Sequence, residues 1–595
     1  MHILTLDFET YFDDDYSLSK LTTEEYIRDP RFEVLGCAFY FNGVGRWVDG
    51  KELSNVFAEI DWSGIAVLCH HAHFDGLILQ HRYGVRPAYW LDTLSMARYV
   101  HGNHIGNSLE SLSNYYGFTP KNVPYALFKG KHWNEIPEPH RQLIANSACH
   151  DCELTRQLFD ELAKQFPEVE YPIVDITIRM FTEPRLVGDQ RLLLDVQQKE
   201  IQDKQALLDA LGVTKKELGS NETFANLLRA EGIEIEYKPG KNGPIPAFAK
   251  TDSFMRALQN SENETVSALA DARLSIKSSI VETRSKRIYD MSTRGALAVY
   301  LYYSGAHTRR WSGGDATNFQ NLNRGSAIRR GIRAPEGFLL AKPDQAQGEC
   351  RILNWFAGQL DVVERFRQGA DPYIGIASKF YGFEVTKEHP AERGTGKQLE
   401  LSCGFGSGAE TIVRTAARGQ YGPPVYLSAE DGLRARDLYR REHQAVVRLW
   451  QVAGDILSWL AARRTFDWNI LHGEGGRLFH PSGNWLDYTG LRWDADAREW
   501  KLASRYGEVR TYGPKLVENV VQWLSRIVTS EAMATLRAYD YPIVGMSHDD
   551  IWLLIPKNSD IEAHRKFIEA TMSGEPSWAP GLPLASECDI GETYK

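Results

Sequence analysis

Long hydrophobic runs are missing from this chain of 595 residues. No stretch approaches the roughly 18 consecutive apolar residues that a membrane-spanning helix needs. The N-terminus also lacks the basic segment that opens a signal peptide. With 43% hydrophobic and 25% charged residues, the composition excludes disordered and collagen-like classes. We expect a soluble intracellular protein, and a length of about 150 residues per domain predicts about four structural units.

Cysteine is also scarce, with seven residues in the whole chain. So low a density cannot form the disulfide framework of a small secreted protein. Cys149 and Cys152 have C-x-x-C spacing, but neither a second pair nor a His-x-x-His motif lies nearby. We therefore expect neither a metal centre nor a redox centre at this pair.

Charge is distributed unevenly along the chain. The formal net charge is −10, yet residues 273–333 alone carry +9, which leaves −19 for the rest. Tyr302, Tyr303 and Trp311 are interleaved with these basic residues. Such a segment is typical of a surface that follows a nucleic-acid phosphate backbone. A solvated helix face is an equally good interpretation of the charge alone.

Hydrophobic periodicity predicts an α/β domain at the start of the chain. Residues 3–10 and 64–72 are expected to be buried strands, and residues 140–166 a helix. From about 170 to 300 we expect mainly helices, interrupted by a loop at 238–244. Further along we expect a strand at 338–341, a helix at 391–405, β-hairpins within 466–512, and two short strands at 543–556 joined by a turn.

Four acidic residues in the N-terminal part form a candidate metal site. Asp7 and Glu9 point to the same face of their strand, because residues i and i+2 do so. Asp75 follows a predicted strand, and Asp151 lies on the apolar stripe of a predicted helix, where an acid is costly unless something binds it. Each acid alone is best interpreted as a surface charge. Together they favour a site for Mg²⁺, which prefers carboxylate oxygens.

The order and spacing of these acids resemble those of the DEDD 3′–5′ exonucleases. The resemblance implies an RNase H-like domain in which Asp7, Glu9, Asp75 and Asp151 hold two metal ions that activate a water against a phosphodiester. We therefore expect exonuclease activity from this domain.

Two positions depart from the exonuclease pattern. His71 stands where the family has an asparagine. Ser147 and Asn146 stand where the family has the Tyr or the His that orients the attacking water. His150 is adjacent to Asp151 but offset from either pattern, so the sequence assigns no residue to this role.

Short motifs in the second half of the chain resemble those of family A DNA polymerases. They are residues 306–312 with 318–321, residues 344–351 (motif A), residues 393–406 (motif B) and residues 547–550 (motif C). A single short motif is a weak signal, but four in the family's order are a specific one. With the exonuclease-like part the resemblance covers nearly the whole chain, and it includes no 5′ nuclease domain. Phe405, Gln345 and Ala346 depart from the usual pattern and resemble phage polymerases, in the branch from phages with 2-aminoadenine genomes.

The chemistry and expected placement of these residues also favour a polymerase active site. Asp344 ends an apolar strand and Asp549 lies in a predicted turn, so folding can bring two carboxylates together to hold a metal pair for phosphoryl transfer. We expect two Mg²⁺ ions per active site, with Mn²⁺ as a substitute. Lys397 and the residues at i−4, i+4 and i+8 from it would form one helical stripe about 18 Å long, which suits one nucleotide.

The resemblance implies a role for each matched residue. Catalytic roles fall to Asp344, Lys397, His548, Asp549 and Asp550; nucleotide binding to Arg393, Lys397, Leu401, Phe405 and Glu349; and DNA binding to Arg310, Gln320, Asn321 and Gln522, to which the basic segment adds Arg284, Lys286 and Arg287. Glu349 corresponds to the steric gate against a ribose 2′-hydroxyl.

The sequence thus predicts an α/β RNase H-like domain followed by an α+β right-hand polymerase domain with palm, fingers and thumb. The expected divisions are residues 1–168 (exonuclease), 169–335 (connection and thumb) and 336–595 (palm, with fingers at about 359–465). We predict a monomeric, template-directed DNA polymerase with a proofreading exonuclease, acting on primer-template DNA and dNTPs in phage replication in the host cytoplasm. Helicase, primase or single-strand binding protein are expected partners, and we expect no association with a membrane. The alternatives are a 3′–5′ exonuclease with a degenerate polymerase half and a non-catalytic primer-template binding protein.

Overall fold

The computed structural model describes residues 1–102, 104–121, 123–240, 243–250, 252–504 and 507–594. The chain forms two compact units. The first comprises Met1–Arg185, Ala298–Asn321 and Ala334–Glu592, and the second comprises Leu186–Leu297, Leu322–Arg333 and the residues from Thr593 onward. The chain therefore passes between the units several times, and the boundaries expected at residues 168 and 335 stay predictions.

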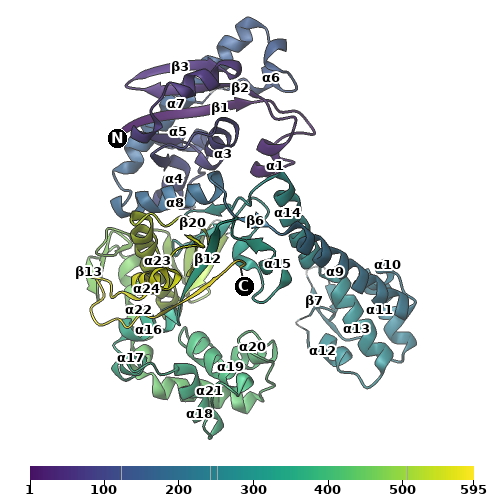
Figure 1. Ribbon diagram of the computed structural model, residues 1–595. Helices are drawn as coiled ribbons and strands as arrows, with labels where there is room; N and C mark the ends of the chain where they lie inside the picture. The colour runs from purple at the N-terminus through teal and green to yellow at the C-terminus, as the bar shows by residue number, and fades with distance from the viewer. Residues whose placement is uncertain (103, 122, 241–242, 251, 505–506, 595) are drawn as a thin grey trace. The chain divides into compact units, whose positions relative to one another are not determined.

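A mixed five-stranded sheet organises the N-terminal part of the first unit (Figure 1). Its order is β3-β2-β1-β4-β5, with β1 antiparallel to β2 and parallel to β4. The strands are β1 (His2–Thr10), β2 (Val34–Phe41), β3 (Val44–Asp49), β4 (Ile65–Cys69) and β5 (Tyr89–Asp92). The strand predicted at 3–10 is confirmed. The strand predicted at 64–72 ends at Cys69, because Ala72 already opens helix α3 (Ala72–Tyr83).

Helix α7 (Glu138–Ala163) packs against β1, β2 and β3. Its buried face carries Asp151, Leu154, Leu158 and Leu162 at intervals of three or four residues, so the helix predicted at 140–166 is confirmed. The other elements of this part are α1 (Thr23–Arg28), η1 (Gly50–Glu52), α2 (Leu53–Ala58), η2 (Trp62–Gly64), α4 (Thr93–His101), α5 (Leu109–Tyr116), α6 (Tyr125–Phe128), η3 (Trp133–Glu135), η4 (Glu168–Glu170) and α8 (Tyr171–Thr182).

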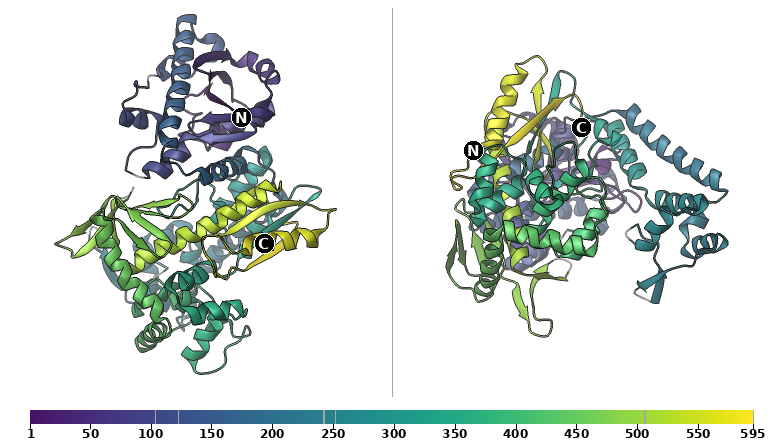
Figure 2. Two further views of the ribbon diagram at one scale, coloured as in Figure 1. Left: turned by 90° about the vertical axis from the view of Figure 1, so that its left-hand side faces the viewer. Right: turned by 90° about the horizontal axis from the view of Figure 1, so that it is seen from below.

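A second, antiparallel sheet of the first unit has the order β20-β21-β12-β22. Its strands are β12 (Phe338–Gln345), β20 (Ile543–Ser547), β21 (Asp550–Pro556) and β22 (Ser586–Gly591). The strands predicted at 338–341 and 543–556 are thus confirmed. Helix α24 (Ile561–Ser573) packs against β12 and β22, and it lies beside β22 in the left view of Figure 2, both in yellow. The long helix α23 (Gly513–Ala538) packs against α24 and α8.

Between the strands β12 and β20 lies a group of helices, most of which share one apolar core with α23. This core includes Phe356, Phe380, Leu457 and Trp523, whereas Val362 and Phe366 belong to a separate small cluster. These elements are α16 (Gly348–Ala357), α17 (Leu360–Arg367), α18 (Pro372–Tyr381), α19 (Pro390–Gln398), the π-helix η6 (Leu399–Cys403), α20 (Ala409–Ala417), α21 (Ala429–Glu442) and α22 (Gln444–Ala461). None of the helices within the described ranges is both long and apolar enough to cross a bilayer.

The helix predicted at 391–405 is corrected by the structure. The α-helix ends at Gln398, a π-helix follows to Cys403, and Phe405 lies beyond it in a turn closed by Gly406 at φ +81°. A π-turn holds more residues than an α-turn. The four residues spaced by four therefore do not form one α-helical stripe.

The β-hairpins predicted within 466–512 are confirmed, with residues 505–506 outside the described ranges. Two small sheets result: β13 (Phe466–Trp468), β14 (Leu471–Glu474), β15 (Arg477–Phe479) and β16 (Trp485–Asp487) form one, and β17 (Leu491–Asp494), β18 (Glu499–Ser504) and β19 (Gly507–Thr511) form the other. Short elements β9 (Leu301–Tyr302), β10 (Ser312–Gly313) and η5 (Phe319–Asn321) complete the first unit.

The second unit is mainly helical, as predicted for residues 170–300. It contains α9 (Gln190–Leu211), α10 (Lys215–Gly219), α11 (Asn221–Ala230), α12 (Ser253–Gln259), α13 (Glu264–Lys277), α14 (Ile280–Arg294), α15 (Ala327–Arg330), and the paired strands β6 (Val187–Gly188) and β11 (Ile332–Arg333). The loop predicted at 238–244 is wrong. β7 (Tyr237–Gly240) pairs with β8 (Gly243–Pro246), and Lys241 and Asn242 lie outside the described residues. A two-stranded ribbon has only edge strands, where proline is tolerated.

Candidate active sites

Two predicted catalytic carboxylates meet at one end of the second sheet. β12 pairs with β21 in a register that places Leu340 opposite Leu554 and Ala341 opposite Leu553. The paired residues end at Ala341 and Leu553; Asp344 follows three residues later on β12, and Asp550, the first residue of β21, precedes Leu553 by three residues. Asp549 precedes Asp550 in the turn after β20. Strand pairing therefore places the acids of motifs A and C together.

Asp344 and Asp549 interact electrostatically. Burial, and then repulsion from Asp344, raise the pKa of the Asp549 carboxyl to about 6. Two carboxylates in one poorly hydrated place repel each other, and a bound cation removes this repulsion. Oxygen donors with excess negative charge fit a hard divalent ion such as Mg²⁺.

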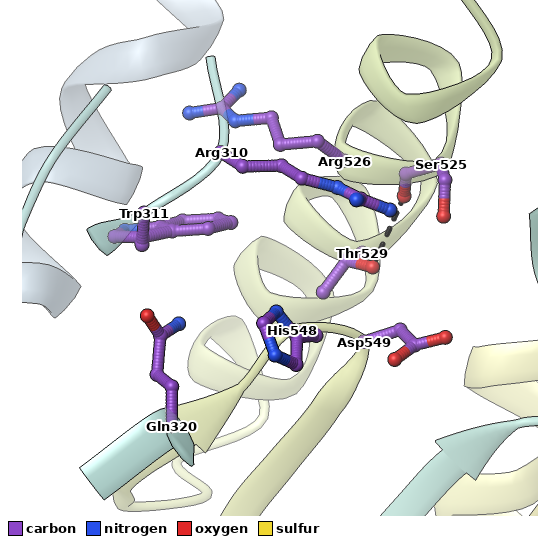
Figure 3. Close-up of a pocket in the computed structure, with 8 residues that line it drawn as sticks. All are labelled: Arg310, Trp311, Gln320, Ser525, Arg526, Thr529, His548 and Asp549. Atoms are coloured by element: carbon purple, nitrogen blue, oxygen red, sulfur yellow. Dashed lines mark hydrogen bonds between the residues drawn. The ribbon is translucent and has the colours of Figure 1, made fainter. Parts of the chain in front are cut away.

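A small pocket adjoins Asp549 (Figure 3). Its lining brings together the predicted residues Arg310, Gln320, His548 and Asp549, which lie far apart in the sequence. Trp311, Ser525, Arg526 and Thr529 complete it. His548 and Asp549 come from one turn, yet their side chains point in different directions in Figure 3. Burial, and then repulsion from Arg310, lower the pKa of His548.

Arg310 forms an ion pair with Glu349, the first acidic residue of α16. Each side chain is 25% exposed. Arg310, the predicted DNA contact, and Glu349, the predicted steric gate, are therefore paired with each other. Arg310 lowers the pKa of Asp549, and Glu349 raises it.

A buried ion pair supports this corner of the molecule. Both guanidinium nitrogens Nη1 and Nη2 of Arg526 bind the Glu170 carboxylate, and Tyr303 Oη donates to Glu170 Oε2 over 2.5 Å. Arg526 Nε also donates to the carbonyl oxygen of Arg309 over 3.1 Å. Burial alone would raise the pKa of Glu170, but attraction to Arg526 outweighs it and lowers that pKa. The pair thus fixes the backbone next to Arg310.

The basic segment 273–333 is not one uninterrupted surface, and its role in DNA binding stays a prediction. The segment is divided between the two units. Arg309 is buried and donates to the carbonyl oxygens of Tyr99 and Trp485, and Trp311 and Tyr303 are core residues. Arg273 and Arg329 are also buried and bind backbone carbonyls. Charge and aromatic content alone cannot separate such structural arginines from surface ones.

Helix α14 of the second unit carries the remaining predicted DNA contacts. Lys286 and Arg287 are exposed and Arg284 is half-buried. Lys286 pairs with Asp290 over 2.5 Å, one helical turn away. In the first unit, Gln522 donates to Glu518 over 3.2 Å on α23, and Asn321 lies exposed at the end of η5.

Helix α19 carries the predicted triphosphate ligands Arg393 and Lys397. Arg393 binds Asp371 through Nη2 at 2.7 Å and Nε at 2.9 Å. Asp371 also caps α18 by accepting from the Tyr373 amide. A Cβ on Gly396 would lie 2.0 Å from the Tyr373 carbonyl oxygen, so glycine here lets α19 approach α18 closely.

The π-helix η6 contains a buried acid that the sequence did not reveal. Glu400 lies 3.3 Å from His443 Nε2, with both side chains at most 4% exposed. Leu401 packs against an apolar cluster of Cys350, Val362 and Phe366. Leu401 therefore faces α16 and α17, and Phe405 packs partly against the core.

The four predicted exonuclease acids lie on β1, α3 and α7 of the first unit. Asp75 Oδ1 accepts from the Phe8 amide over 3.1 Å, which ties α3 to β1. Burial raises the pKa of Asp7 to about 7 with further repulsion from Asp151, and burial also raises the pKa values of Glu9, Asp75 and Asp151. The strand and helix placement expected for these acids thus brings their charges within range of one another.

A lysine that sequence reasoning missed lies among these acids. Lys121 Nζ is 2.5 Å from Asp151 Oδ2. Among the described residues, no three His, Cys, Asp or Glu side chains are arranged to hold a metal ion. The donor chemistry at the exonuclease acids suits Mg²⁺, but their present arrangement does not, and we derive no catalytic step through a metal there. Lys121 precedes α6 without any periodic pattern, so no sequence signal marks it.

The positions that depart from the exonuclease pattern have other partners. His71 Nε2 hydrogen-bonds the Tyr300 hydroxyl at 2.7 Å, and burial lowers the pKa of His71 to about 4. Asn146 is exposed and accepts from Gln142 over 2.9 Å. His150 Nδ1 lies 3.6 Å from Glu153, one turn along α7.

The known proteins to which this chain is similar are DNA polymerases. No protein-family model matches the sequence. The chain is similar to the DNA polymerase of Bacillus phage SP02, with 24% identity over 680 aligned positions that cover 100% of both chains. It is also similar to DNA polymerase I of Pseudomonas aeruginosa (24% identity, 42% of this chain and 28% of that protein) and to thermostable DNA polymerase I of Thermus filiformis (23%, 50% and 32%).

The fold is that of a solved polymerase domain. The POL domain of Pol1 from M. smegmatis, in a complex with DNA primer-template and dNTP, superimposes with a TM-score of 0.69 at 16% identity, over 99% of this chain and 95% of that chain. The predicted fold class is therefore confirmed: a mixed α/β N-terminal domain followed by a polymerase-like α+β domain.

Proposed function

We propose that the chain is a template-directed DNA polymerase that extends a DNA primer with dNTPs. The observation that carries this proposal is the meeting of Asp344 and Asp549 at the end of adjacent strands, where burial and mutual repulsion raise the pKa of Asp549 to about 6. The fold supports it, since the similar solved domain was determined with primer-template and dNTP. In this proposal the second sheet is the palm, and the helices α17–α22 are the fingers.

The chain's own residues position the reactants. Asp344 and Asp549 would hold two Mg²⁺ ions, or Mn²⁺ in their place. When bound, these ions favour the deprotonated primer 3′-oxygen and neutralise the leaving pyrophosphate. Arg393 and Lys397 bind the triphosphate, and Glu349 excludes a ribose 2′-hydroxyl. His548, beside Arg310 and Gln320, contacts the primer end.

Two alternatives make different predictions. A 3′–5′ exonuclease with a degenerate polymerase half would shorten a primer and never extend it. A non-catalytic primer-template binding protein would do neither. The paired acids argue against a protein that only binds, because two negatively charged carboxylates beside DNA phosphates weaken affinity unless a cation lies between them.

A primer-extension assay separates the three functions. The full chain is incubated with a 5′-labelled primer on a longer template, Mg²⁺ and all four dNTPs. We expect products longer than the primer. Only shorter products would favour the exonuclease, and an unchanged primer that is still retained by the protein would favour the binding protein.

We further propose a 3′–5′ proofreading activity at Asp7, Glu9, Asp75 and Asp151. Its support is the convergence of four acids, three of them buried, on β1, α3 and α7. Asp7→Ala combined with Glu9→Ala should stop the removal of a mismatched 3′ nucleotide and leave extension of a matched primer unchanged. If the wild-type chain leaves a mismatched end intact, the proofreading proposal fails.

The setting of this activity is also a proposal. The full-length similarity to a phage DNA polymerase supports a role in phage DNA replication in the bacterial cytoplasm, together with helicase, primase or single-strand binding protein. The relation to phages with 2-aminoadenine genomes and the monomeric state stay predictions.

A further inference from the structure

Lys121 brings a positive charge into the carboxylate cluster of Asp7, Glu9, Asp75 and Asp151. It lies between α5 and α6, and its ammonium group is 2.5 Å from Asp151 Oδ2. The Asp151 side chain is 2% exposed and that of Lys121 24% exposed. Asp151 Oδ1 is buried and has no hydrogen-bond partner within the described ranges. The lysine is therefore the main polar partner of this acid.

The same ammonium acts on two further acids of the cluster. Attraction to Lys121 counteracts the rise in pKa that burial imposes on Asp7 and Glu9. In turn, burial alone would lower the pKa of Lys121, but attraction to Asp151 and Asp7 outweighs it and raises that pKa. Lys121 is thus one cation shared by three acids from β1 and α7.

The carboxylate cluster needs a cation because several buried negative charges lie close together. Isolated buried carboxylates are strongly destabilising, and like charges close together add to that cost. An ammonium among them lowers it in the same way as a metal ion would. No three acids of the described chain are arranged to hold an ion as they stand, whereas the ammonium group of Lys121 already lies at Asp151.

We propose that Lys121 is a built-in counter-cation of the exonuclease site, and that a divalent ion must displace its ammonium group from Asp151 before the site can bind metal. This inference rests on the proposed exonuclease function and adds its regulation: metal binding competes with an internal ion pair. The cluster then stays folded without metal, and the nuclease becomes active only when divalent ions are abundant enough to win this competition.

Binding of Mn²⁺ alone tests the competition without any measurement of activity. The background chain carries Asp344→Asn and Asp549→Asn, so that the palm acids do not contribute. Mn²⁺ binding is followed by electron paramagnetic resonance in this background and with Lys121→Met, which keeps the length of the side chain and removes its charge. We expect Lys121→Met to bind Mn²⁺ at least tenfold more tightly.

Two further variants control for charge and place. Lys129→Met removes a lysine that pairs with the exposed Asp14 in the same part of the chain, and it should bind Mn²⁺ like the background. Adding Asp7→Ala to Lys121→Met should abolish the gain, which locates the ion at the cluster. Circular dichroism and thermal unfolding monitor folding, and Mg²⁺ should raise the Tm of Lys121→Met more than that of the background.

Three outcomes would overturn the inference. Equal Mn²⁺ affinity with and without Lys121 means that the lysine does not compete. Weaker binding by a folded Lys121→Met chain means that the lysine builds the metal site. A gain that survives Asp7→Ala means that the ion binds elsewhere. If Mn²⁺ binding rises as expected while the wild-type chain never shortens a mismatched primer, the inference holds and the proofreading proposal alone fails.

Discussion

Asp549 illustrates how a catalytic side chain is held at a cost to stability. Its carboxyl group lies beside Asp344 in a poorly hydrated turn, and both effects favour the protonated form. An uncharged side chain at position 549 would be more favourable for folding. Strain of this kind is typical of sites built to receive a cation.

In the metal-free protein, Asp549→Asn should therefore raise the free energy of unfolding at pH 7. The folded-state pKa is about 6 against an ordinary value of 3.8. Between these values the folded protein binds more protons than the unfolded one, so stability falls as pH rises through this window. Asparagine does not titrate, so we expect a gain of about 1–3 kcal/mol at pH 7 that shrinks toward pH 4. Urea unfolding in EDTA at both pH values measures it, and a pH-independent difference would contradict it.

Arg393 is another residue whose present partner bears on function. It shares the Asp371 carboxylate with the N-terminus of α18, and this ion pair is partly exposed, at 32% and 14%. An incoming triphosphate would compete with Asp371 for the guanidinium group. Asparagine at the same position still caps a helix but does not hold the arginine by charge.

Asp371→Asn should thus lower the KM for dNTPs about two- to fivefold and leave kcat unchanged, because a partly exposed pair contributes up to about 1 kcal/mol. Steady-state extension of a matched primer measures both constants. Asp361→Asn is the control, since Asp361 pairs with Arg365 on α17 outside the predicted triphosphate contacts. A rise in KM would show that Asp371 holds Arg393 in its productive position.

At the scale of elements, periodicity predicted the strands and helices that carry most of the candidate site. β1, β12, the β20–β21 hairpin and α7 all follow from alternation or helical spacing, and each carries a predicted acid. The π-helix after α19 did not follow from periodicity; its buried Glu400 lies beside His443, 43 residues away, and no local pattern shows this contact. Hairpin β7–β8 was missed because glycine and proline favour turns locally, whereas cross-strand pairing decided the outcome.

Partners that are distant in sequence could not be predicted either. Lys121 and Asp151, or Glu170 and Arg526, are 30 and 356 residues apart and follow no short motif. Their meeting depends on how whole elements pack. The sequence therefore indicates which acidic residues could form a catalytic site, and the structure shows which basic side chains pair with buried acids.

The junction between η4 and α23 offers a test at this scale. Glu170→Gln leaves the buried Arg526 without its counter-charge and should destabilise the protein by about 3–5 kcal/mol. Glu592→Gln, which breaks the exposed pair with Lys557, should cost less than about 1 kcal/mol. Urea unfolding of both variants measures the contrast. Similar small losses in both would mean that the buried pair does not hold this junction.

At the scale of the whole molecule, a net charge of −10 must be reconciled with the proposed binding to DNA. Three of the twelve basic residues in segment 273–333 are buried, namely Arg273, Arg309 and Arg329. Helix α14 of the second unit keeps exposed basic residues, Lys286 and Arg287. Surface cations of this kind, and not the total charge, determine the salt dependence of DNA binding.

Replacing Arg284, Lys286 and Arg287 by glutamate should weaken primer-template binding and flatten its salt dependence. Each lost phosphate contact changes the slope of log affinity against log salt by about 0.7 to 0.9. Fluorescence anisotropy across a salt series measures the slope. The control is glutamate at Lys215 and Lys216, exposed residues of α10 in the same unit. An unchanged slope in the α14 variant would place the DNA elsewhere.

The central claim, template-directed synthesis at Asp344 and Asp549, is tested most directly by single-nucleotide incorporation. A matched primer is placed on four templates that differ only in the first unpaired base, and each dNTP is supplied alone with Mg²⁺. We predict that the wild-type chain adds the complementary nucleotide in each case. We also predict that Asp549→Asn still binds the primer-template but adds none, because loss of a metal ligand costs several kcal/mol in the transition state. Addition that ignores the template base, or near-normal addition by Asp549→Asn, would contradict the account.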